Sequence, residues 1–387
     1  MRPIPYARQS VAQADIDAVV GVLRSDWLTQ GPAVERFEDE VAQSCGAEHA
    51  IAVSNGTAGL HLACLALGLG PGDLLWTSSN TFVASANCAR YCGAEVDFVD
   101  IDPRTYNLSV EALAWKLEQA RRAGRLPKIV VPVHFGGRPC DMPAIAKLAE
   151  EYGFRVLEDA SHAVGAEIGH ARVGAGTHSD ITVFSFHPVK IVTTGEGGML
   201  LTRDSGLASR LRLLRTHGIT RAAEQMEGKS EGPWYYQQIA LGCNYRMTDL
   251  QAALGSSQLR RLDQFLARRR ALAARYHSTL QGLPLSTPVA DDSTSSSWHL
   301  YVVQLDLESL RRSRREIFER MREAGVQVNV HYIPVHLHPY YRNLGFRKGA
   351  YPACERYYER AMSLPMFFEL SDADQDRVCT TLRESLH

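Results

Sequence analysis

Apolar and polar positions along this chain predict strands and helices in regular alternation. The segment HAIAV (49–53) is a short apolar run, and small polar residues lead from it into a helical apolar pattern at 60–69. Another apolar run begins at Ile181 and ends shortly before Lys190. This alternation indicates an α/β fold, with a mostly parallel sheet and helices on both of its faces. Further strands, with helices between them, are predicted at 74–77, 95–99, 129–134 and 154–158.

The C-terminal third has a different pattern. A capping box at 248–251 opens a long connecting helix over about 248–280. We therefore predict a large α/β domain at residues 1–250 and a small C-terminal α+β domain at residues 251–387. The segments predicted after the connecting helix are a short low-complexity loop (292–297), a strand (300–305), a helix (314–324), a strand (326–331) and two more helices.

Composition and charge narrow the class of protein. The chain has 387 residues, of which 45% are hydrophobic and 22% charged, as in an ordinary soluble globular protein. The net charge of −1 gives no field that would attract nucleic acid or an anionic membrane. We also find no signal-peptide pattern and no apolar run long enough to cross a bilayer. The eight cysteines are scattered without a CxxC pair, which indicates buried free thiols in a cytoplasmic protein and no metal site.

One lysine is placed where α/β proteins carry their chemistry. Lys190 follows the apolar run 181–186 and precedes the glycine-rich turn 195–198. Strand ends followed by such turns carry binding and catalytic residues. A lysine amine that is held unprotonated there can form a Schiff base with an aldehyde cofactor. The alternative is an ordinary surface lysine at the end of a strand.

Pyridoxal phosphate is an aldehyde cofactor of that kind, and it makes several demands on a protein. Its ring nitrogen must be paired with a carboxylate to stay protonated, and Asp159 at the end of a buried strand is placed for this. Its ring needs a flat partner, which Phe82 can supply. The lysine must be able to move, and the adjacent glycines give it room. Alternatively, Asp159 caps a helix, Phe82 belongs to the core and His162 is a structural histidine.

The phosphate of this cofactor needs hydrogen-bond donors, which the chain offers after the strand at 49–53. The candidates are the backbone of Gly56 and Thr57, the Thr57 hydroxyl and Ser185. A helix that starts here would add its dipole, and Gly56 permits a close approach. The alternative is an ordinary capped helix start, in which Ser54 or Thr57 only satisfies backbone donors.

Three segments together carry a family resemblance: SNGTAGL (54–60), EDASHA (158–163) and SFHPVKIVTTGEGGM (185–199). They resemble the DegT/DnrJ/EryC1/StrS sugar aminotransferase family, and the resemblance runs over nearly the whole chain. It implies a fold-type-I pyridoxal phosphate enzyme with a seven-stranded sheet in its large domain. More narrowly, the segments 76–103 and 232–249 resemble the aminotransferase of pseudaminic acid biosynthesis.

The resemblance implies roles for particular residues. Lys190 would be the Schiff-base lysine and the acid/base catalyst, and Asp159 would pair with the pyridinium nitrogen. His162 would hydrogen-bond the phenolic oxygen of the cofactor. The other expected contacts are Phe82 on the ring, Gly56, Thr57 and Ser185 at the phosphate, the partner subunit's Asn244 in a homodimer with shared active sites, and Arg246, His331 and His336 near the sugar nucleotide.

The implied reaction is an amino transfer in two halves. L-glutamate would convert the cofactor to pyridoxamine phosphate, and the amine would then pass to C4 of a UDP-linked 2-acetamido-2,6-dideoxy-4-ketohexose. The product would be UDP-4-amino-4,6-dideoxy-N-acetyl-beta-L-altrosamine, for pseudaminic acid on flagellin or a surface glycan. Related dehydratases have histidine in place of the lysine, so Lys190 favours amination. Two alternatives stay open: another acceptor (a UDP-4-keto-pentose, GDP-4-keto-6-deoxymannose or a D-series UDP sugar), or a non-catalytic regulator that binds the cofactor.

Overall fold

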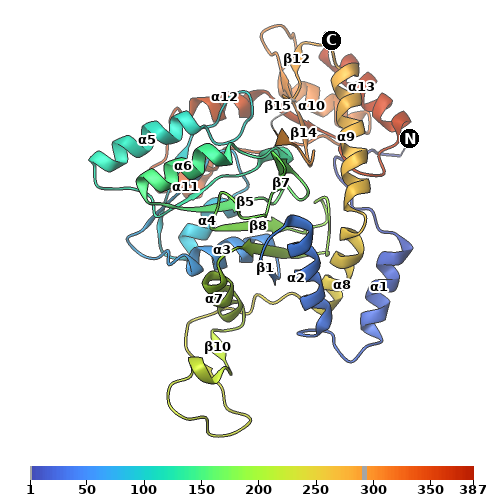
Figure 1. The fold of residues 1–387 in the computed structure, drawn as a ribbon. Helices are drawn as coiled ribbons and strands as arrows, with labels where there is room; N and C mark the ends of the chain where they lie inside the picture. Colours follow the sequence, from blue (N-terminus) through green and yellow to red (C-terminus); the bar gives the residue numbers. More distant parts are fainter. Residues whose placement is uncertain (1, 290–293) are drawn as a thin grey trace.

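A seven-stranded sheet forms the centre of the molecule. The computed structural model describes residues 2–289 and 294–387. The strands follow the order β1-β9-β8-β5-β4-β2-β3 (Figure 1). β9 pairs antiparallel with β1 and β8, and the other neighbours pair in parallel, so the predicted mostly parallel sheet is confirmed. The bounds are β1 (His49–Val53), β2 (Leu74–Ser78), β3 (Glu95–Val99), β4 (Ile129–Val131), β5 (Arg155–Asp159), β8 (Ile181–Ser185) and β9 (Gly198–Thr202).

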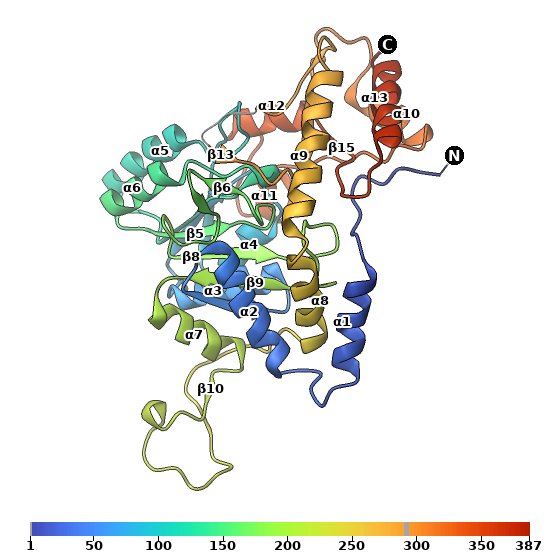
Figure 2. The same ribbon diagram turned by 45° about the vertical axis from the view of Figure 1, so that its right-hand side comes forward.

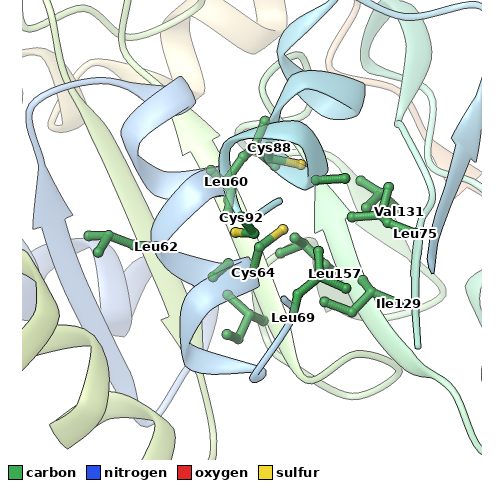
Figure 3. Packing of buried hydrophobic residues seen from close by; sticks show 14 of the residues in the cluster. Leu60, Leu62, Cys64, Leu69, Leu75, Cys88, Cys92, Ile129, Val131 and Leu157 are labelled. Carbon is green, nitrogen blue, oxygen red and sulfur yellow. The ribbon is translucent and has the colours of Figure 1, made fainter. Parts of the chain in front are cut away.

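Helices cover both faces of this sheet, because successive strand residues point to opposite sides. Ile51 and Leu75 lie in one apolar cluster, whereas their neighbours Ala52 and Trp76 lie in two others. α3, α4 and α7 cover the first face, and Figure 3 shows residues of α3 and α4 packing on the sheet there. α2 and α8 cover one end of the opposite face, and α5 and α6 cover the other. The bounds are α2 (Pro32–Cys45), α3 (Gly56–Ala66), α4 (Ala84–Tyr91), α5 (Val110–Arg122), α6 (Met142–Tyr152), α7 (Ser205–Arg215) and α8 (Asp249–Leu259).

The connecting helix starts as predicted. Its capping box is present, because the N–H of Thr248 donates to Oε1 of Gln251 (2.9 Å) and the N–H of Gln251 donates to Oγ1 of Thr248 (3.3 Å). The helix does not continue to residue 280, however. α8 ends at Leu259, and a separate helix, α9, runs over Leu262–Thr279. The prediction of one helix over 248–280 is therefore wrong.

Side-chain contacts to one buried carboxylate explain this break. Arg261 leaves the helical conformation (φ −101°, ψ 4°), and its guanidinium donates to Oδ2 of Asp15 (3.2 Å). The side chain of Gln258 donates to the same oxygen at 2.7 Å. Asp15 belongs to α1 (Gln13–Leu23), so the break between α8 and α9 is tied to the N-terminal helix.

The C-terminal part has its own small sheet and apolar core. β14 (Tyr301–Leu305) pairs antiparallel with β12 (Leu285–Ser286) and β15 (Ala361–Leu364). Residues of α9, α10 and α13 pack there, beside one another in Figure 2, and Ile4 from the N-terminal end joins the same cluster. The domain boundary at residue 250 stays a prediction. The C-terminal helices are α10 (Arg314–Glu323), α11 (Pro339–Asn343), α12 (Pro352–Arg360) and α13 (Asp372–Leu386).

The strand predicted at 326–331 is wrong. Val326 pairs with Ile4, and Asn329 pairs with Ser363, each as an isolated bridge. The side-chain oxygen of Asn329 accepts from the N–H of Val330 (2.8 Å). Such a local bond offers the backbone an alternative to a strand ladder.

Two other predicted segments differ in their details. β4 is shorter than the predicted strand at 129–134, because beyond Val131 the pairing continues only as a single bridge between Val133 and Asp159. Of the predicted loop at 292–297, residues 292 and 293 lie outside the described residues. Thr294–Ser295 is not a loop but a short strand, β13, which pairs antiparallel with β6 (Glu167–Ile168).

A hairpin arm, residues 219–241, projects from the body of the molecule in both views (Figures 1 and 2). Within it, β10 (Ile219–Thr220) pairs antiparallel with β11 (Gln237–Gln238). The arm carries exposed apolar side chains, with Trp234 70% and Leu241 88% exposed. Exposed apolar patches are typical of surfaces that contact another chain or a membrane. In the described part of the chain, every helix is too short or too polar to span a bilayer.

Candidate active site

A cavity of about 730 Å³ lies where the carboxyl ends of β1, β5 and β8 meet. Ligands of open α/β sheets bind at this edge, because the loops after parallel strands converge there. The sheet therefore brings together residues that are far apart in the sequence. The predicted site residues that line the cavity are Gly56, Thr57, Phe82, Asp159, His162, Ser185, Lys190 and His331.

Lys190 lies in the turn that follows β8. Its N–H donates to the carbonyl oxygen of His187 (2.8 Å), which holds the turn. Burial lowers the pKa of Lys190 from 10.5 to about 8, although the nearby carboxylate of Asp159 acts in the opposite direction. An amine with this pKa is unprotonated far more often near neutral pH than that of an ordinary lysine. Lys190 is therefore able to act as a nucleophile and as a base.

Asp159 ends β5 and is 5% exposed. Oδ2 accepts a hydrogen bond from Oγ of Ser85 (2.5 Å). Oδ1 accepts from the N–H (3.1 Å) and the hydroxyl (2.6 Å) of Ser161. The residues after Asp159 form turns, so the alternative that it caps a helix is wrong. Three donors fix this carboxylate at the edge of the cavity.

Phe82 lies just before α4 and lines the same cavity. It is 57% exposed, so the alternative that it belongs to the core is wrong. Its ring centroid lies 6.2 Å from that of Tyr332. An aromatic face beside a cavity is suited to a flat ligand.

The start of α3 offers unpaired donors. Asn55 caps the helix by accepting from the N–H of Ala58 (2.8 Å), so neither Ser54 nor Thr57 is the cap. Among the described residues, no group accepts from the N–H of Gly56 or of Thr57. Helix N-termini with free N–H groups bind phosphate.

Gly56 and Ser185 approach each other closely at this helix start. A Cβ placed on Gly56 would lie 2.9 Å from Cβ of Ser185, so any side chain there would fill the space beside the free N–H groups. The hydroxyls of Ser185 and Thr57 also have no partner among the described residues. The cavity thus has four neighbouring donors for an anion.

His162 is 6% exposed and neutral. Burial holds its pKa well below the usual value, and a positive charge on Lys190, or on His331 when that residue is protonated, lowers it further. Its Nδ1 accepts from the N–H of Gly136 (3.3 Å), and its Nε2 lies 3.0 Å from the hydroxyl of Tyr332. His331 also lines the cavity, and burial, with Lys190 adding to it, lowers the pKa of His331 to about 4.

Three predicted residues do not line the cavity. His336 is fully buried, with Nδ1 2.5 Å from the hydroxyl of Ser79 and Nε2 2.9 Å from the carboxylate of Glu355. The structure therefore places it in the interior and not in the lining of this cavity. Asn244 is exposed and Arg246 half-buried; both follow the hairpin arm and are not among the residues that line this chain's own cavity.

Three residues of the site were not predicted from the sequence: Ser85, His299 and Tyr332. Ser85 lies in the helix expected after the strand at 74–77, and His299 directly precedes the strand predicted at 300–305. Tyr332 lies beside the candidate residue His331, so an aromatic residue next to a candidate histidine was the available signal. All three take their place through contacts that are distant in the sequence.

Residues 9–383 match the DegT/DnrJ/EryC1/StrS aminotransferase family. The chain belongs to this family. This aminotransferase is 42% identical to the spore coat polysaccharide biosynthesis protein SpsC of Bacillus subtilis over 384 residues, which cover 98% of this chain and 96% of SpsC. The resemblance expected from the three sequence segments is thus confirmed.

Solved structures agree with this assignment. PseC of Helicobacter pylori, an aminotransferase involved in the biosynthesis of pseudoaminic acid, is 26% identical with a TM-score of 0.90, over 100% of this chain and 99% of that chain. The PLP form of Spr1654 from Streptococcus pneumoniae is 28% identical with a TM-score of 0.88, over 99% and 98% of the two chains. The protein is a pyridoxal-phosphate-dependent sugar aminotransferase with the fold-type-I architecture.

The cavity fits this cofactor in three separate respects. A phosphate requires hydrogen-bond donors and open space beside them. The start of α3 offers both, because Gly56 has no Cβ to fill that space. A buried carboxylate, Asp159, is available for a protonated ring nitrogen. Lys190 supplies an amine with a lowered pKa. No group of His, Cys, Asp and Glu in the described residues is arranged to hold a metal ion.

Proposed function

We propose that this enzyme transfers the amino group of L-glutamate to C4 of a UDP-linked 2-acetamido-2,6-dideoxy-4-ketohexose. The product is UDP-4-amino-4,6-dideoxy-N-acetyl-beta-L-altrosamine, which leads to pseudaminic acid on flagellin or a surface glycan. One observation is the main support for amino transfer: Lys190 and Asp159 line the same cavity as the free hydrogen-bond donors at the start of α3. All eight cysteines are free thiols, which supports a cytoplasmic setting.

Some residues of this chain bind the cofactor, and Lys190 also transfers the proton. Pyridoxal phosphate, when bound, supplies an aldehyde and an electron-withdrawing ring. Asp159 accepts the hydrogen of the ring nitrogen and keeps that nitrogen protonated. Nζ of Lys190 binds the cofactor between turnovers and takes up and returns the proton that moves during amino transfer. Phe82 covers one face of the ring, and the groups around Gly56 hold the phosphate.

The proposed acceptor rests on two similarities. PseC, which this chain matches over its whole length, is described as acting in pseudoaminic acid biosynthesis. SpsC, at 42% identity, is named for the synthesis of a spore coat polysaccharide. The first similarity supports an amino sugar of the pseudaminic acid pathway as the product, and the second supports a sugar that is built for a polysaccharide.

The composition of the cavity supports a homodimer with shared active sites. Among the described residues that line it, Lys190 is the single lysine or arginine. A UDP diphosphate and the two carboxylates of glutamate call for more positive charge or more donors than one lysine provides. We propose that the partner subunit's Asn244 reaches the phosphate and that the partner subunit's Arg246 lies close to it. The exposed apolar side chains of the arm support a contact with a second copy.

A coupled assay tests both the reaction and the acceptor. Protein supplied with pyridoxal phosphate, L-glutamate and the UDP-ketohexose should form 2-oxoglutarate and a 4-amino sugar whose stereochemistry is determined by NMR. Lys190→Ala should lose the visible absorption of the bound cofactor together with amino transfer, whereas Lys229→Ala, at an exposed site in the arm, should keep both.

The outcomes separate the two parts of the proposal. A wild-type protein that stays colourless and inactive with pyridoxal phosphate would contradict the amino transfer. Amino transfer to a UDP-4-keto-pentose, to GDP-4-keto-6-deoxymannose or to a D-series UDP sugar, but not to the proposed ketohexose, would contradict the acceptor alone.

A further inference from the structure

Three thiols lie together on the face of the sheet that α3 and α4 cover. Cys64 belongs to α3, Cys88 belongs to α4, and Cys92 is the residue that ends α4. Cys64 forms side-chain hydrogen bonds with both of the others, and Figure 3 shows the three side chains close together. Thiols in contact with one another are the starting arrangement for a disulfide.

Cys92 and Cys64 differ in their surroundings. Cys92 is 9% exposed, whereas Cys64 is fully buried. The hydrogen bond with Cys64 lowers the pKa of Cys92 to about 6, although burial acts in the opposite direction, and His61 lowers it further. Burial raises the pKa of Cys64 well above its usual value, and the neighbouring thiols add to this. Near neutral pH, Cys92 is therefore a thiolate at the edge of the cluster, and Cys64 is a protonated thiol behind it.

His61 is held beside the sulfur of Cys92 by two tyrosines. Its side chain forms a hydrogen bond with Cys92. Its Nδ1 lies 3.1 Å from the hydroxyl oxygen of Tyr245, and its ring meets that of Tyr91 edge-on at 5.6 Å between centroids. A thiolate beside a histidine and at the edge of the interior has the surroundings of a reactive cysteine.

We propose that Cys92 and Cys64 are a redox-active thiol pair: hydrogen peroxide oxidises Cys92, and Cys64 then forms a disulfide with it. Cys64 is the second thiol because it contacts Cys92 directly, whereas Cys88 contacts Cys64. The disulfide joins the two helices whose first turns carry Gly56 and Ser85, next to the active-site cavity. Disulfides of proteins in reducing compartments are typically of this reversible kind.

The oxidation takes place in two steps. The thiolate of Cys92 attacks one oxygen of hydrogen peroxide, the O–O bond breaks, hydroxide leaves and Cys92 becomes a sulfenic acid. The sulfur of Cys64 then attacks the sulfur of Cys92. An S–S bond forms, the S–O bond breaks, and the oxygen leaves as water with the proton of Cys64. Two electrons thus pass from the two cysteines to the peroxide.

Peptide mapping of the full-length protein tests this pair. Trypsin cleaves after Arg90, so Cys92 falls in the peptide 91–104, whereas Cys64 and Cys88 fall in the peptide 37–90. Reduced protein treated with hydrogen peroxide at pH 7, then alkylated in denaturant, should give these two peptides joined, with the loss of two hydrogens. Tandem mass spectrometry should place the bond at Cys64, and dithiothreitol should release it.

Three variants assign the order of the steps. Cys92→Ser should form no cross-link. Cys64→Ala should stop at the sulfenic acid of Cys92, which dimedone labels, and this variant keeps the reactive thiol in place. Cys88→Ala is the matched control, because it removes a thiol of the same cluster and should form the cross-link as the wild type does.

The reactivity of the first thiol is measured separately. Without peroxide, iodoacetamide at pH 7 should label Cys92 about tenfold faster than Cys243, which is half-buried and thus more exposed. Labelling of Cys92 no faster than that of Cys243 would overturn the inference. A cross-link that persists in Cys92→Ser, that joins Cys88 in place of Cys64, or that does not form in the wild type would overturn it as well.

Discussion

Ser85 donates a hydrogen bond of 2.5 Å to Asp159 and thereby links the first turn of α4 to the end of β5. The hydroxyl of Ser85 also lies 2.7 Å from that of Thr81. Phe82, the expected partner of the cofactor ring, lies between these two residues in the sequence. One short segment thus orients both the carboxylate for the ring nitrogen and the aromatic face for the ring.

Replacement of Ser85 by alanine tests this link. Ser85→Ala leaves Oδ2 of Asp159 without its protein donor, and a hydrogen bond to a charged group contributes about 1.5–3 kcal/mol. We expect the affinity for pyridoxal phosphate to fall at least tenfold, as measured by absorption titration. Ser209→Ala, at an exposed serine of α7, is the control. Equal affinities in the two variants would show that Ser161 alone orients the carboxylate.

The approach of Gly56 to Ser185 gives a second prediction. A Cβ on residue 56 would lie 2.9 Å from Cβ of Ser185, so Gly56→Ala forces the start of α3 away from β8. Overpacking of this kind costs about 1–3 kcal/mol. We expect urea unfolding of the cofactor-free protein to show this loss, together with weaker binding of pyridoxal phosphate. Gly70→Ala is the control, because a Cβ at Gly70 meets nothing within 4 Å. If the two alanine variants are equally stable and bind alike, the close approach has no role in the phosphate site.

The sequence was enough to predict the framework of the sheet. Its apolar runs are short, and each is separated from the next by a helical pattern. The observed bounds of β1 (His49–Val53) and β3 (Glu95–Val99) therefore agree with the predicted ones. β9 was missed, because the segment Gly198–Thr202 is a brief apolar run that periodicity does not separate from the helix after it. Local patterns therefore identify most strands, but not one that is short and lies next to a helix.

The residues that the sequence misplaced are those that take their position through distant contacts. His336 is held by Ser79, 257 positions away in the sequence, so nothing in its own segment shows that it is buried. Tyr332 meets His162 across 170 positions. Lys190 and Asp159 were predicted to share a site because Asp159 comes at the end of one predicted strand and Lys190 a few residues after another, and the ends of parallel strands converge.

A third prediction concerns the residue before Asp159. Glu158 is buried and accepts from His134 (2.7 Å) and from the hydroxyls of Ser179 and Thr182. Glu158→Ala leaves the N–H of His134 buried without an acceptor and leaves a void. We expect a loss of about 3 kcal/mol in the free energy of unfolding, as measured in urea. Glu150→Ala, at an exposed site of α6, should change it little.

The same carboxylate predicts a pH dependence of stability. Burial raises the pKa of Glu158, but the hydrogen bond from His134 and those from Ser179 and Thr182 outweigh it, so the pKa lies below its usual value of 4.5. A carboxylate with a lowered pKa stabilises the fold above that usual value, and the contribution is lost as the pH falls through the folded pKa. Unfolding midpoints of the wild type should therefore drop on acidification below about pH 4.5. Glu158→Gln should show a shallower drop, and an equal slope would contradict this assignment.

The last prediction concerns the amine itself. In the cofactor-free protein, burial lowers the pKa of Lys190 to about 8, and the negative charge of Asp159 limits that decrease. Labelling by an amine-reactive reagent, followed by mass spectrometry, should therefore rise with pH around a midpoint near 8, well below the ordinary value of 10.5. The exposed Lys229 in the same sample is an internal control. Asp159→Asn removes the charge that favours the protonated amine, so it should move the midpoint of Lys190 to lower pH and leave Lys229 unchanged. A shared midpoint for the two lysines, or a shift to higher pH in Asp159→Asn, would show that the carboxylate and the burial of the site do not set the reactivity of Lys190.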